Sequence, residues 1–320
     1  MKAGDLPPID DPEPLTGGEL GNAELSTLAP SALFDLNQAA MDDAVPDRPL
    51  IAPLAPMSVL RAEYENGNQV FVQQIDWLGE HGYIGIRRTR GDGDCFYRSL
   101  AFAYIERILN SADPILAAVQ AVSRLESTQE MLEAVGFQRL VFEDFLEMFT
   151  TLIKRIVEPE PGVPMLTAKG LLEAFNAPEV SNSVVVYLRL LTSAQIRIDP
   201  DAYAPFLFHP ELAIPMEPRE FCENFVEAVG KEADHVQITA LTRALCVNIF
   251  VAYLDGRLRT RSVSNNDKGK GKEREAVEVE FVEFQNGEEG LDPVRLLYRP
   301  GHYDILDSRC EEPDVDMEMA

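Results

Sequence analysis

The sequence predicts an α+β domain in which the helices come first along the chain and the strands come last. From near Ser58 to Leu245, apolar side chains recur every three or four positions, which places them on one face of a helix. From Val247 onward, apolar and polar side chains alternate, as they do along a strand. Helices segregated from strands are typical of an α+β fold, so we expect a mostly antiparallel sheet.

The helical part of the chain divides into successive apolar stripes. A long helical region follows Cys95, which comes directly after a glycine-rich turn. A second helix has a clear start, because Asp113 can cap an N-terminus and Pro114 suits the first helical position. The predicted stripes are Val59, Leu60, Tyr64, Val70, Phe71, Ile75 and Leu78; Phe96, Leu100, Ala103, Tyr104 and Ile108; Ile115, Val119, Val122 and Leu125; Leu140, Val141, Phe145, Met148, Leu152 and Ile156; Leu171, Leu172 and Phe175; Val184, Val185, Leu188 and Leu191; and Phe221, Phe225 and Val229.

The strand part of the chain is rich in β-branched and aromatic residues, which favour extended backbone. Ile84 and Ile86 mark a short extended segment before the first long helix. Pro300 and Gly301 form a turn after the strand VRLLYR, and HYDIL continues as a strand. The predicted strands are VNIFVAYL (247–254), VEVEFVEF (277–284), VRLLYR (294–299) and HYDIL (302–306).

Composition divides the chain into one folded domain and polar segments around it. Residues 1–56 are rich in Pro, Asp and Glu, and we interpret them as a disordered acidic tail. The folded domain should span residues 57–307, and residues 308–320 form a second acidic tail. Within the domain, 263–275 is a low-complexity polar insertion, read as a disordered hairpin extension or as a nuclear-import or anion-binding patch. Residues 25–41 are more apolar, and either dock on a partner or reflect composition alone.

The charge of the chain argues against several classes of partner. Its 54 acidic and 28 basic residues give a net charge of -26, which would repel nucleic acid and anionic membrane surfaces and would suit a substrate with basic side chains. The start lacks the apolar stretch of a secretory signal, and the richest apolar run, residues 183–191, is about half of a membrane span.

The cysteines indicate where the protein works. The four cysteines, Cys95, Cys222, Cys246 and Cys310, lie far apart with no C-x-x-C pair, which argues against a disulfide scaffold and against a zinc site. We therefore expect no metal cofactor. A reducing compartment fits this pattern, and we expect the cytoplasm, with the nucleus as a second location.

One cysteine has the setting of a nucleophile. Cys95 lies where the glycine-rich turn 91–94 meets an amphipathic helix. A helix N-terminus carries partial positive charge and unpaired N–H groups, which favour a thiolate and can also bind an oxyanion. A small buried residue is the plain alternative for a cysteine at such a position. The chemistry therefore depends on whether the chain also supplies a base.

His302 and Asp304 are the candidates for a base and the group that orients it. The chain has four histidines, and His302 alone follows a turn and starts a predicted strand with an acidic residue two positions on. Residues two apart share one face of a strand, which brings carboxylate and imidazole within reach. Together with Cys95 they would form a Cys-His-Asp triad. A surface histidine beside an aspartate on an edge strand is the alternative.

Four segments together resemble one known family. The chain resembles the otubains, papain-like ubiquitin isopeptidases of the ovarian-tumour superfamily, over roughly residues 50–307. A papain-like fold is therefore implied, with a helical subdomain and a small, mostly antiparallel sheet. The segments that carry the resemblance are GDGDCFYR (91–98), RLLTS (189–193), EFCENFVEAVGKEADHVQITAL (220–241) and LLYRPGHYDIL (296–306).

The resemblance implies roles for four residues and a substrate. It implies Cys95 as nucleophile, His302 as general base and acid, Asp304 as the orienting residue and Asp92 as the residue that shapes the oxyanion loop. The reaction implied is hydrolysis of the bond between the C-terminal glycine of ubiquitin and a lysine, including polyubiquitin chains that mark proteins for the proteasome. No cofactor is implied. Ubiquitin-conjugating enzymes are further candidate partners.

The chain departs from the family pattern at Asp94, where the family usually has Asn. A carboxylate next to the nucleophile could disfavour the Cys95 thiolate unless a basic residue such as Arg88 or Arg90 neutralises it. If the carboxylate does suppress the thiolate, the alternative function is that of a non-catalytic protein that binds ubiquitin or a conjugating enzyme. A deconjugase for another ubiquitin-like modifier is also open.

Three residues near these motifs are candidates for substrate binding. Tyr97 and Arg98 follow the nucleophile and could line a channel for the ubiquitin tail, although helix packing and a surface ion pair would explain them equally well. His235, at a predicted helix start, is either a structural or a ubiquitin-facing residue. No second His or Cys stands at metal-ligand spacing from it.

Overall fold

The computed structural model describes residues 48–257, 277–287 and 292–308. The predicted segments 25–41 and 263–275 and nearly all of both predicted tails lie outside these ranges. The chain from Pro49 onward forms one compact unit. It is an α+β domain with a six-stranded sheet, as the sequence predicts.

The elements alternate only at the start of the domain, and helices then run without interruption up to the third strand. The helices are α3 (Met57–Tyr64), α4 (Gln69–Glu80), α5 (Cys95–Leu109), α6 (Pro114–Ser127), α7 (Gln129–Ala134), α8 (Arg139–Lys154), α9 (Ala168–Asn176), α10 (Pro178–Ile198), α11 (Pro200–Tyr203), the 3-10 turn η1 (Ala204–Phe206), α12 (Pro218–Phe225) and α13 (His235–Leu245). The strands are β1 (Ala55–Pro56), β2 (Gly85–Arg87), β3 (Asn248–Tyr253), β4 (Glu280–Gln285), β5 (Val294–Arg299) and β6 (His302–Asp307).

The sheet is mostly antiparallel, in the order β1-β2-β6-β5-β3-β4. Among the described strands, β3 and β5 form the one parallel pair. Strands β5 and β6 form a hairpin across the predicted turn, in which Arg299 pairs with His302. Gly301 turns this hairpin with a φ of 74°, a conformation that favours glycine. The strand β6 is thereby held in the interior of the sheet, between β2 and β5.

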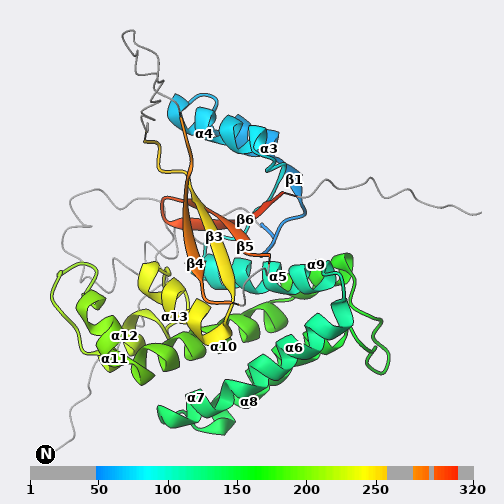
Figure 1. Cartoon of the computed structure of the whole chain (residues 1–320), viewed down its shortest axis with the longest axis vertical. Coiled ribbons are helices and arrows are strands. Elements are labelled where there is room, and N and C mark those ends of the chain that lie inside the picture. Colours follow the sequence, from blue (N-terminus) through cyan, green and yellow to red (C-terminus); the bar gives the residue numbers. More distant parts are fainter. Residues whose placement is uncertain (1–47, 258–276, 288–291, 309–320) are drawn as a thin grey trace, which may run out of the picture. The chain divides into compact units, whose positions relative to one another are not determined.

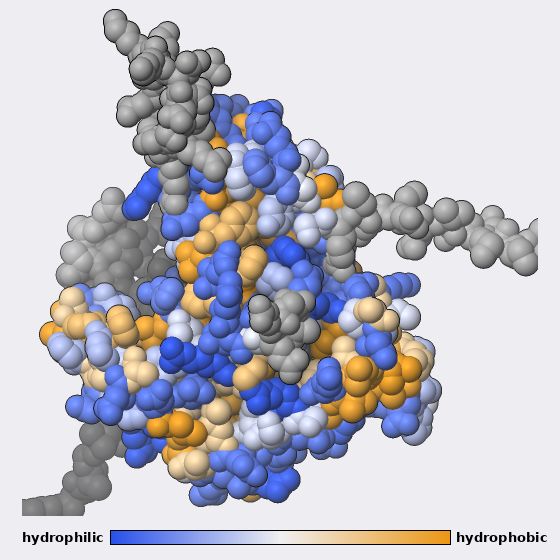
Figure 2. All heavy atoms as spheres, viewed as in Figure 1, coloured by the Kyte–Doolittle hydropathy of each residue, from blue (hydrophilic) through white to orange (hydrophobic). Residues whose placement is uncertain are grey.

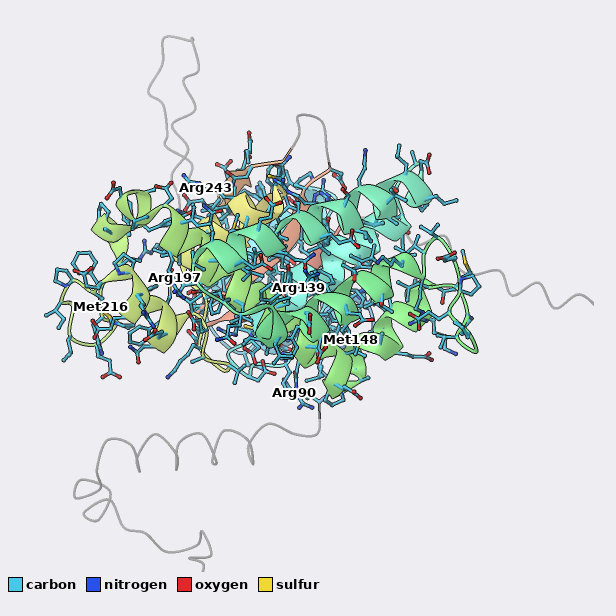
Figure 3. All side chains as sticks on the ribbon, turned by 90° about the horizontal axis from the view of Figure 1, so that it is seen from below. Arg90, Arg139, Met148, Arg197, Met216 and Arg243 are labelled. Atoms are coloured by element: carbon cyan, nitrogen blue, oxygen red, sulfur yellow. The ribbon has the colours of Figure 1, made fainter. Side chains whose placement is uncertain are left out.

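Helices cover the two faces of the sheet unequally. In Figure 1, α3 and α4 lie on one side of the sheet and the other helices lie on the opposite side. Figure 3 looks onto this larger helical layer, where Arg139 and Met148 mark α8 and Arg197 marks the end of α10. Adjacent residues of a strand serve opposite faces: Leu296 packs in the large core and Leu297 in the small one.

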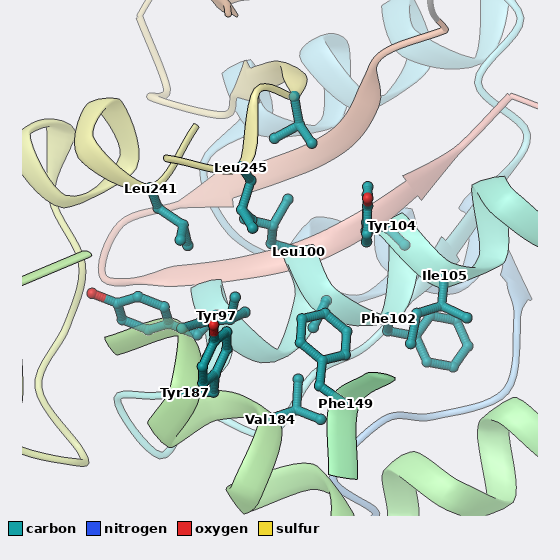
Figure 4. Packing of buried hydrophobic residues seen from close by; sticks show 14 of the residues in the cluster. Tyr97, Leu100, Phe102, Tyr104, Ile105, Phe149, Val184, Tyr187, Leu241 and Leu245 are labelled. Carbon is teal, nitrogen blue, oxygen red and sulfur yellow. The ribbon is translucent and has the colours of Figure 1, made fainter. Parts of the chain in front are cut away.

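The large core lies between the sheet and α5, which is buried along almost its whole length. Figure 4 shows Leu100 and Phe102 of α5 close to Phe149, Val184 and Tyr187 of the surrounding helices, with Leu241 and Leu245 contributed by α13. A helix that is apolar on all sides is typical of a core element. The residue that starts α5, Cys95, is therefore fixed by the best-packed helix of the domain.

The folded domain begins earlier than the sequence predicts. The predicted acidic tail ended at residue 56, but Leu50 and Ile51 are buried. The Ile51 N–H donates to the side chain of Asn176 at 3.2 Å, and the Asn176 amide returns a bond to the Ile51 carbonyl at 2.9 Å. The boundary is wrong by several residues because these contacts come from a helix far along the chain, which local composition does not reveal.

Two predicted apolar stripes are wrong in part: Val122 and Leu125 of the first and Leu152 and Ile156 of the second are buried, but other members are not. On α6, Ile115 and Val119 are exposed, and the buried face runs through Val122 and Leu125 with small alanines. On α8, Leu140 is 79% exposed, and the buried face is Phe142, Leu146, Phe149, Leu152 and Ile153. Val229 is also exposed, beyond the end of α12. Figure 2 shows such apolar side chains as separate groups on a largely polar surface.

The corrected face of α8 predicts opposite outcomes for neighbouring residues. Phe142 is 0% exposed and Val141 is 50% exposed. Phe142→Ala should lower the free energy of unfolding by about 3–5 kcal/mol, because it leaves a cavity in the core. Val141→Ala, the matched control, should change it by less than about 0.5 kcal/mol. Urea unfolding of both variants measures the difference, and equal effects would contradict the assigned face.

Candidate active site

The predicted nucleophile is the first residue of α5 and is nearly enclosed. Cys95 is 3% exposed. The first amide of α5 to bond within the helix is that of Arg98, which donates to the Asp94 carbonyl at 3.0 Å. The N–H groups of the first turn, that of Cys95 included, therefore point out of the helix end. This end can bind a developing oxyanion beside the sulfur.

The loop before Cys95 is shaped by Asp92. Its Oδ1 accepts the Asp94 N–H at 3.0 Å, and its Oδ2 pairs with Nη1 of Arg98 at 2.7 Å. Arg98 is buried, so this ion pair is shielded from water. Asp92 therefore ties the loop to the first turn of α5. The Asp94 amide is engaged by this bond, which leaves the amides nearer Cys95 for an oxyanion.

His302 and Asp304 share one face of β6, as the spacing predicts. Nε2 of His302 lies 2.8 Å from Oδ1 of Asp304. The same oxygen accepts the Thr89 N–H at 2.9 Å, and Oδ2 accepts Nη2 of Arg299 at 2.6 Å. Asp304 is fully buried. A carboxylate held from three sides fixes the plane and the tautomer of the imidazole.

A cross-link between α5 and β6 brings the two halves of the site together. The Ser99 hydroxyl, one turn after Cys95, donates to the carbonyl of Tyr303 at 3.3 Å, although the two residues are 204 positions apart. Ser99 also bonds to Thr89 Oγ1 at 2.7 Å. The rings of Phe96 and Tyr303 meet edge to face at 5.4 Å. Helix and strand are therefore locked next to the residues that carry the chemistry.

Cys95 and Asp304 both act on the protonation of His302. Because Nε2 of His302 contacts Asp304, the other ring nitrogen, Nδ1, is left for the sulfur, and it faces Gly91, where a Cβ would lie 3.5 Å away. Burial alone would lower the pKa of His302, but the hydrogen bonds and charges of Asp304 and Cys95 outweigh it and raise the pKa to about 9. The histidine is therefore cationic at neutral pH.

Asp304 remains ionised despite its burial. Burial would raise its pKa, but the hydrogen bond from His302 and the positive charge of Arg299 hold the pKa below the usual value. The buried charges alternate from Arg299 through Asp304 to His302.

The carboxylate of Asp94 has a counter-ion, although it is neither of the residues considered from the sequence. Arg88 is paired with Glu63. Asp94 accepts Nε of Arg189 at 2.9 Å, and this arginine comes from the middle of α10. The pair is neutral as a whole, so the expected penalty on the thiolate is offset within the protein. The basic partner that the sequence left open, with Arg88 and Arg90 as examples, is thus Arg189, which comes from a distant helix.

Of the three predicted substrate-binding residues, Tyr97 and Arg98 are buried and His235 is exposed. Tyr97 and Arg98 have almost no exposed surface, since Tyr97 lies under Arg189 and Arg98 holds Asp92. Packing therefore explains both side chains, and a direct role in a tail channel is not supported. His235 is exposed at the start of α13, where Asp234 forms a capping box, and its ring lies 5.0 Å from that of Phe284.

The remaining cysteines and histidines lie in settings of other kinds. Burial raises the pKa of Cys222 to about 12, as expected of an inert core thiol. Cys246 ends α13 in a left-handed conformation with a φ of 52°. His81 stacks on Trp77 and His209 lies against Phe225. In the described ranges, no group of three or more His, Cys, Asp or Glu residues could hold a metal, and no helix is long and apolar enough to cross a membrane.

Sequence reasoning missed the residues that support this site. Thr89, Ser99, Arg189 and Arg299 all hold a candidate catalytic residue or its loop. Arg189 and Arg299 do lie within quoted motifs, RLLTS and LLYRPGHYDIL. A charged residue at an apolar helix position, as Arg189 is, was the available signal, because such a residue is buried only with a partner.

Comparison with known proteins assigns the family. The family described as peptidase C65 otubain matches residues 43–308. The chain belongs to the otubain family. This agrees with the papain-like fold expected from the sequence, and the observed sheet and helical layer are those of this family's solved members.

This otubain is similar to named proteins over most of its length. It is 34% identical to ovarian tumor domain-containing deubiquitinating enzyme 1 of Arabidopsis thaliana, over 91% of this chain and 89% of that protein. It is 36% identical to human ubiquitin thioesterase OTUB1, over 81% of this chain and 83% of that protein. A solved OTUB1 complex with ubiquitin aldehyde and UBC13~Ub aligns with a TM-score of 0.70 and 25% identity, over 88% of this chain and 98% of that one.

The raised pKa of His302 predicts where activity ends at high pH. The pKa of His302 in the folded protein is about 9, above the ordinary value of 6.5. The protonated imidazole therefore stabilises the folded protein fully below pH 6.5, and this stabilisation is lost as the pH rises through 9. The basic limb of kcat/KM should therefore lie near pH 9. Asp304→Asn removes the charge and should move this limb down by roughly 1–3 pH units.

The control for this shift is Glu63→Gln. Glu63 lies 3.5 Å from Arg299 without touching His302, so its loss should leave the limb in place. The His302 pKa itself is read from the ¹⁵N shifts of the imidazole. A limb that does not move in Asp304→Asn would show that the carboxylate does not set the protonation of the base.

Proposed function

We propose that this otubain is a deubiquitinating thiol isopeptidase that hydrolyses the bond between the C-terminal glycine of ubiquitin and a lysine, including polyubiquitin chains that mark proteins for the proteasome. The observation that carries the proposal is the set Cys95, His302 and Asp304: the imidazole contacts the carboxylate at 2.8 Å, and Cys95 helps to raise the pKa of His302. The names of its relatives, ubiquitin thioesterase and deubiquitinating enzyme, support the same activity.

In the first step, the Cys95 thiolate attacks the isopeptide carbonyl. His302 has already taken the thiol proton before the attack and remains an imidazolium during it, since its pKa is about 9. Asp304 keeps the imidazole in the ring orientation that points Nδ1 at the sulfur. The enclosed position of Cys95 restricts the acyl group to a slim one, which suits a glycine.

After the attack, the tetrahedral intermediate collapses to a thioester. Its oxyanion is bound by N–H groups at the start of α5, held in place by Asp92. The His302 imidazolium gives its proton to the leaving lysine amine, and a thioester remains on Cys95. His302 then activates a water, which attacks the thioester and frees the ubiquitin carboxylate. No step needs a metal ion or a nucleotide.

The partners that fit this function are ubiquitin, polyubiquitin and ubiquitin-conjugating enzymes. The similar solved complexes are named for ubiquitin aldehyde with UBC13~Ub or UBCH5B~Ub. A net charge of -26 suits a substrate with basic side chains near its scissile end. Cys95, Cys222 and Cys246 are free thiols in the part of the chain that is described. We propose a reducing location for this enzyme, the cytoplasm and also the nucleus.

A non-catalytic ubiquitin-binding or conjugating-enzyme-binding role is the second candidate. It depended on the idea that Asp94 would suppress the nucleophile, and Arg189 offsets that charge. The contacts of Asp304 with Arg299 and His302, and the effect of Cys95 on the His302 pKa, favour the enzyme. A panel of di-ubiquitins, cleaved by wild type and intact with Cys95→Ala, separates the two functions and assigns the linkage.

Labelling with a ubiquitin C-terminal electrophile tests the nucleophile. We expect a single adduct on wild-type protein, which Cys95→Ala abolishes, because Cys95 is the thiol paired with an imidazole. Cys246→Ala is the matched control and should label at the wild-type rate. Intact-protein mass spectrometry measures both. An adduct that persists in Cys95→Ala would overturn the assignment.

Substitution of histidines tests the base. His302→Ala should lower kcat by roughly 10²–10⁴-fold, since no other group can hold or return the proton at the sulfur. His209→Ala and His235→Ala should leave kcat mostly intact, because their rings lie against Phe225 and Phe284 instead. A comparable loss of kcat in either control would contradict the choice of His302.

A further inference from the structure

Arg189 is a fully buried cation that binds several backbone segments at once. It is 0% exposed, in the middle of α10. Besides the bond from Nε to Asp94, its Nη2 donates to the carbonyls of Gly93 at 3.1 Å and Lys231 at 2.6 Å, and Nη1 donates to the carbonyl of Val226 at 3.0 Å. One guanidinium thus joins α10, the loop before Cys95 and the segment 226–231.

The segment 226–231 is pressed against the nucleophile loop beside this arginine. The Gly230 N–H donates to Oδ1 of Asp94 at 3.1 Å. A Cβ at Gly93 would lie 2.1 Å from the Gly230 carbonyl oxygen, so the two backbones touch. Gly93 and Gly230 have φ angles of 78° and 73°, which favour glycine at both positions. This contact leaves no room for the loop to shift toward the segment.

The same segment continues to the turn that carries the base. A Cβ at Gly301, the residue before His302, would lie 3.4 Å from the Glu232 carboxylate. Gly230 therefore packs on the nucleophile loop, and Glu232, two residues later, lies next to the His302 turn. The position of this segment influences both Cys95 and His302.

We propose that Arg189 is a positioning residue for the reaction: it clamps the nucleophile loop to segment 226–231 and so sets the alignment of Cys95 with His302. Only a planar fork of five N–H donors can serve Asp94 and three carbonyls together, and the Tyr97 ring, 4.4 Å from the guanidinium carbon, keeps that fork flat. The proposal rests on the proposed function. It also accounts for Asp94, since a carboxylate matches both the charge and the geometry of this cation.

Kinetics of Arg189→Lys is the central test. Lysine keeps the charge but is a point donor, so it cannot hold all four partners. We expect kcat on ubiquitin with a C-terminal fluorogenic amide to fall roughly 10- to 100-fold, with KM within about twofold, since a small misplacement of reacting groups has such an effect. Assays are run well below the melting temperature of each variant.

The matched control is Arg197→Lys, two turns further along α10. Arg197 also pairs with an acid, Glu227 of segment 226–231, donates to the carbonyl of Val135 and lies over the ring of Phe137. Within the described part of the chain it has no bond to residues 91–94, so this control separates the clamp on the nucleophile loop from support of the segment alone. Its loss should lower the melting temperature and leave kcat within about twofold of wild type. Asp94→Asn keeps an acceptor oxygen for Arg189, so it should lower the melting temperature more than kcat.

A second readout does not depend on turnover. Clamping keeps Cys95 next to His302, and Cys95 helps to raise the His302 pKa, so Arg189→Lys should lower the pKa of His302 read by ¹⁵N NMR, and Arg197→Lys should not. The proposal is overturned if Arg189→Lys lowers the melting temperature but leaves kcat and the pKa of His302 as in the wild type. If wild type neither labels nor cleaves ubiquitin, the proposed function fails instead, and the His302 titration still decides the role of Arg189.

Discussion

The packing of α5 against β6 is the constraint on which the site depends. The helix supplies Cys95 and the strand supplies His302 and Asp304, and Ser99 bonds the helix to the Tyr303 carbonyl between the last two. Because α5 is buried on nearly all sides, it cannot rotate or slide without breaking the large core. The reactive pair is therefore as rigid as the core itself, and the chemistry needs no rearrangement of these two elements.

Buried ion pairs secure the loops that the core does not reach. Arg98 with Asp92 and Arg189 with Asp94 hold the loop before Cys95, and Arg299 with Asp304 holds the base. Such pairs contribute little net stability, because both charges lose their water. Their value is geometric, since a guanidinium fixes the direction of each partner. In a chain with a net charge of -26, arginines are placed where backbone carbonyls and carboxylates converge on the site.

The exchange of Asn for Asp at position 94 illustrates how context decides the effect of a charge. Beside a thiolate, an isolated carboxylate would be unfavourable. In this protein its oxygen accepts hydrogen bonds from Nε of Arg189 and from the Gly230 N–H, so the positive charge of Arg189 neutralises the carboxylate. The departure from the family pattern is therefore compatible with the chemistry proposed for Cys95, and Asp94 takes part in the contact between the nucleophile loop and segment 226–231.

The fold class, the turn between β5 and β6, and the candidates Cys95, His302 and Asp304 could be predicted from the amino-acid sequence, because helix starts, strand alternation and turn residues are local features of the chain. The buried face of α8, the inclusion of Leu50 in the domain and the pairing of Arg189 with Asp94 became visible in the folded chain. These depend on contacts between distant segments. Periodicity states that a helix has an apolar face, but the neighbouring elements select among similar faces, and the partner of a buried charge is fixed only when the chain is packed.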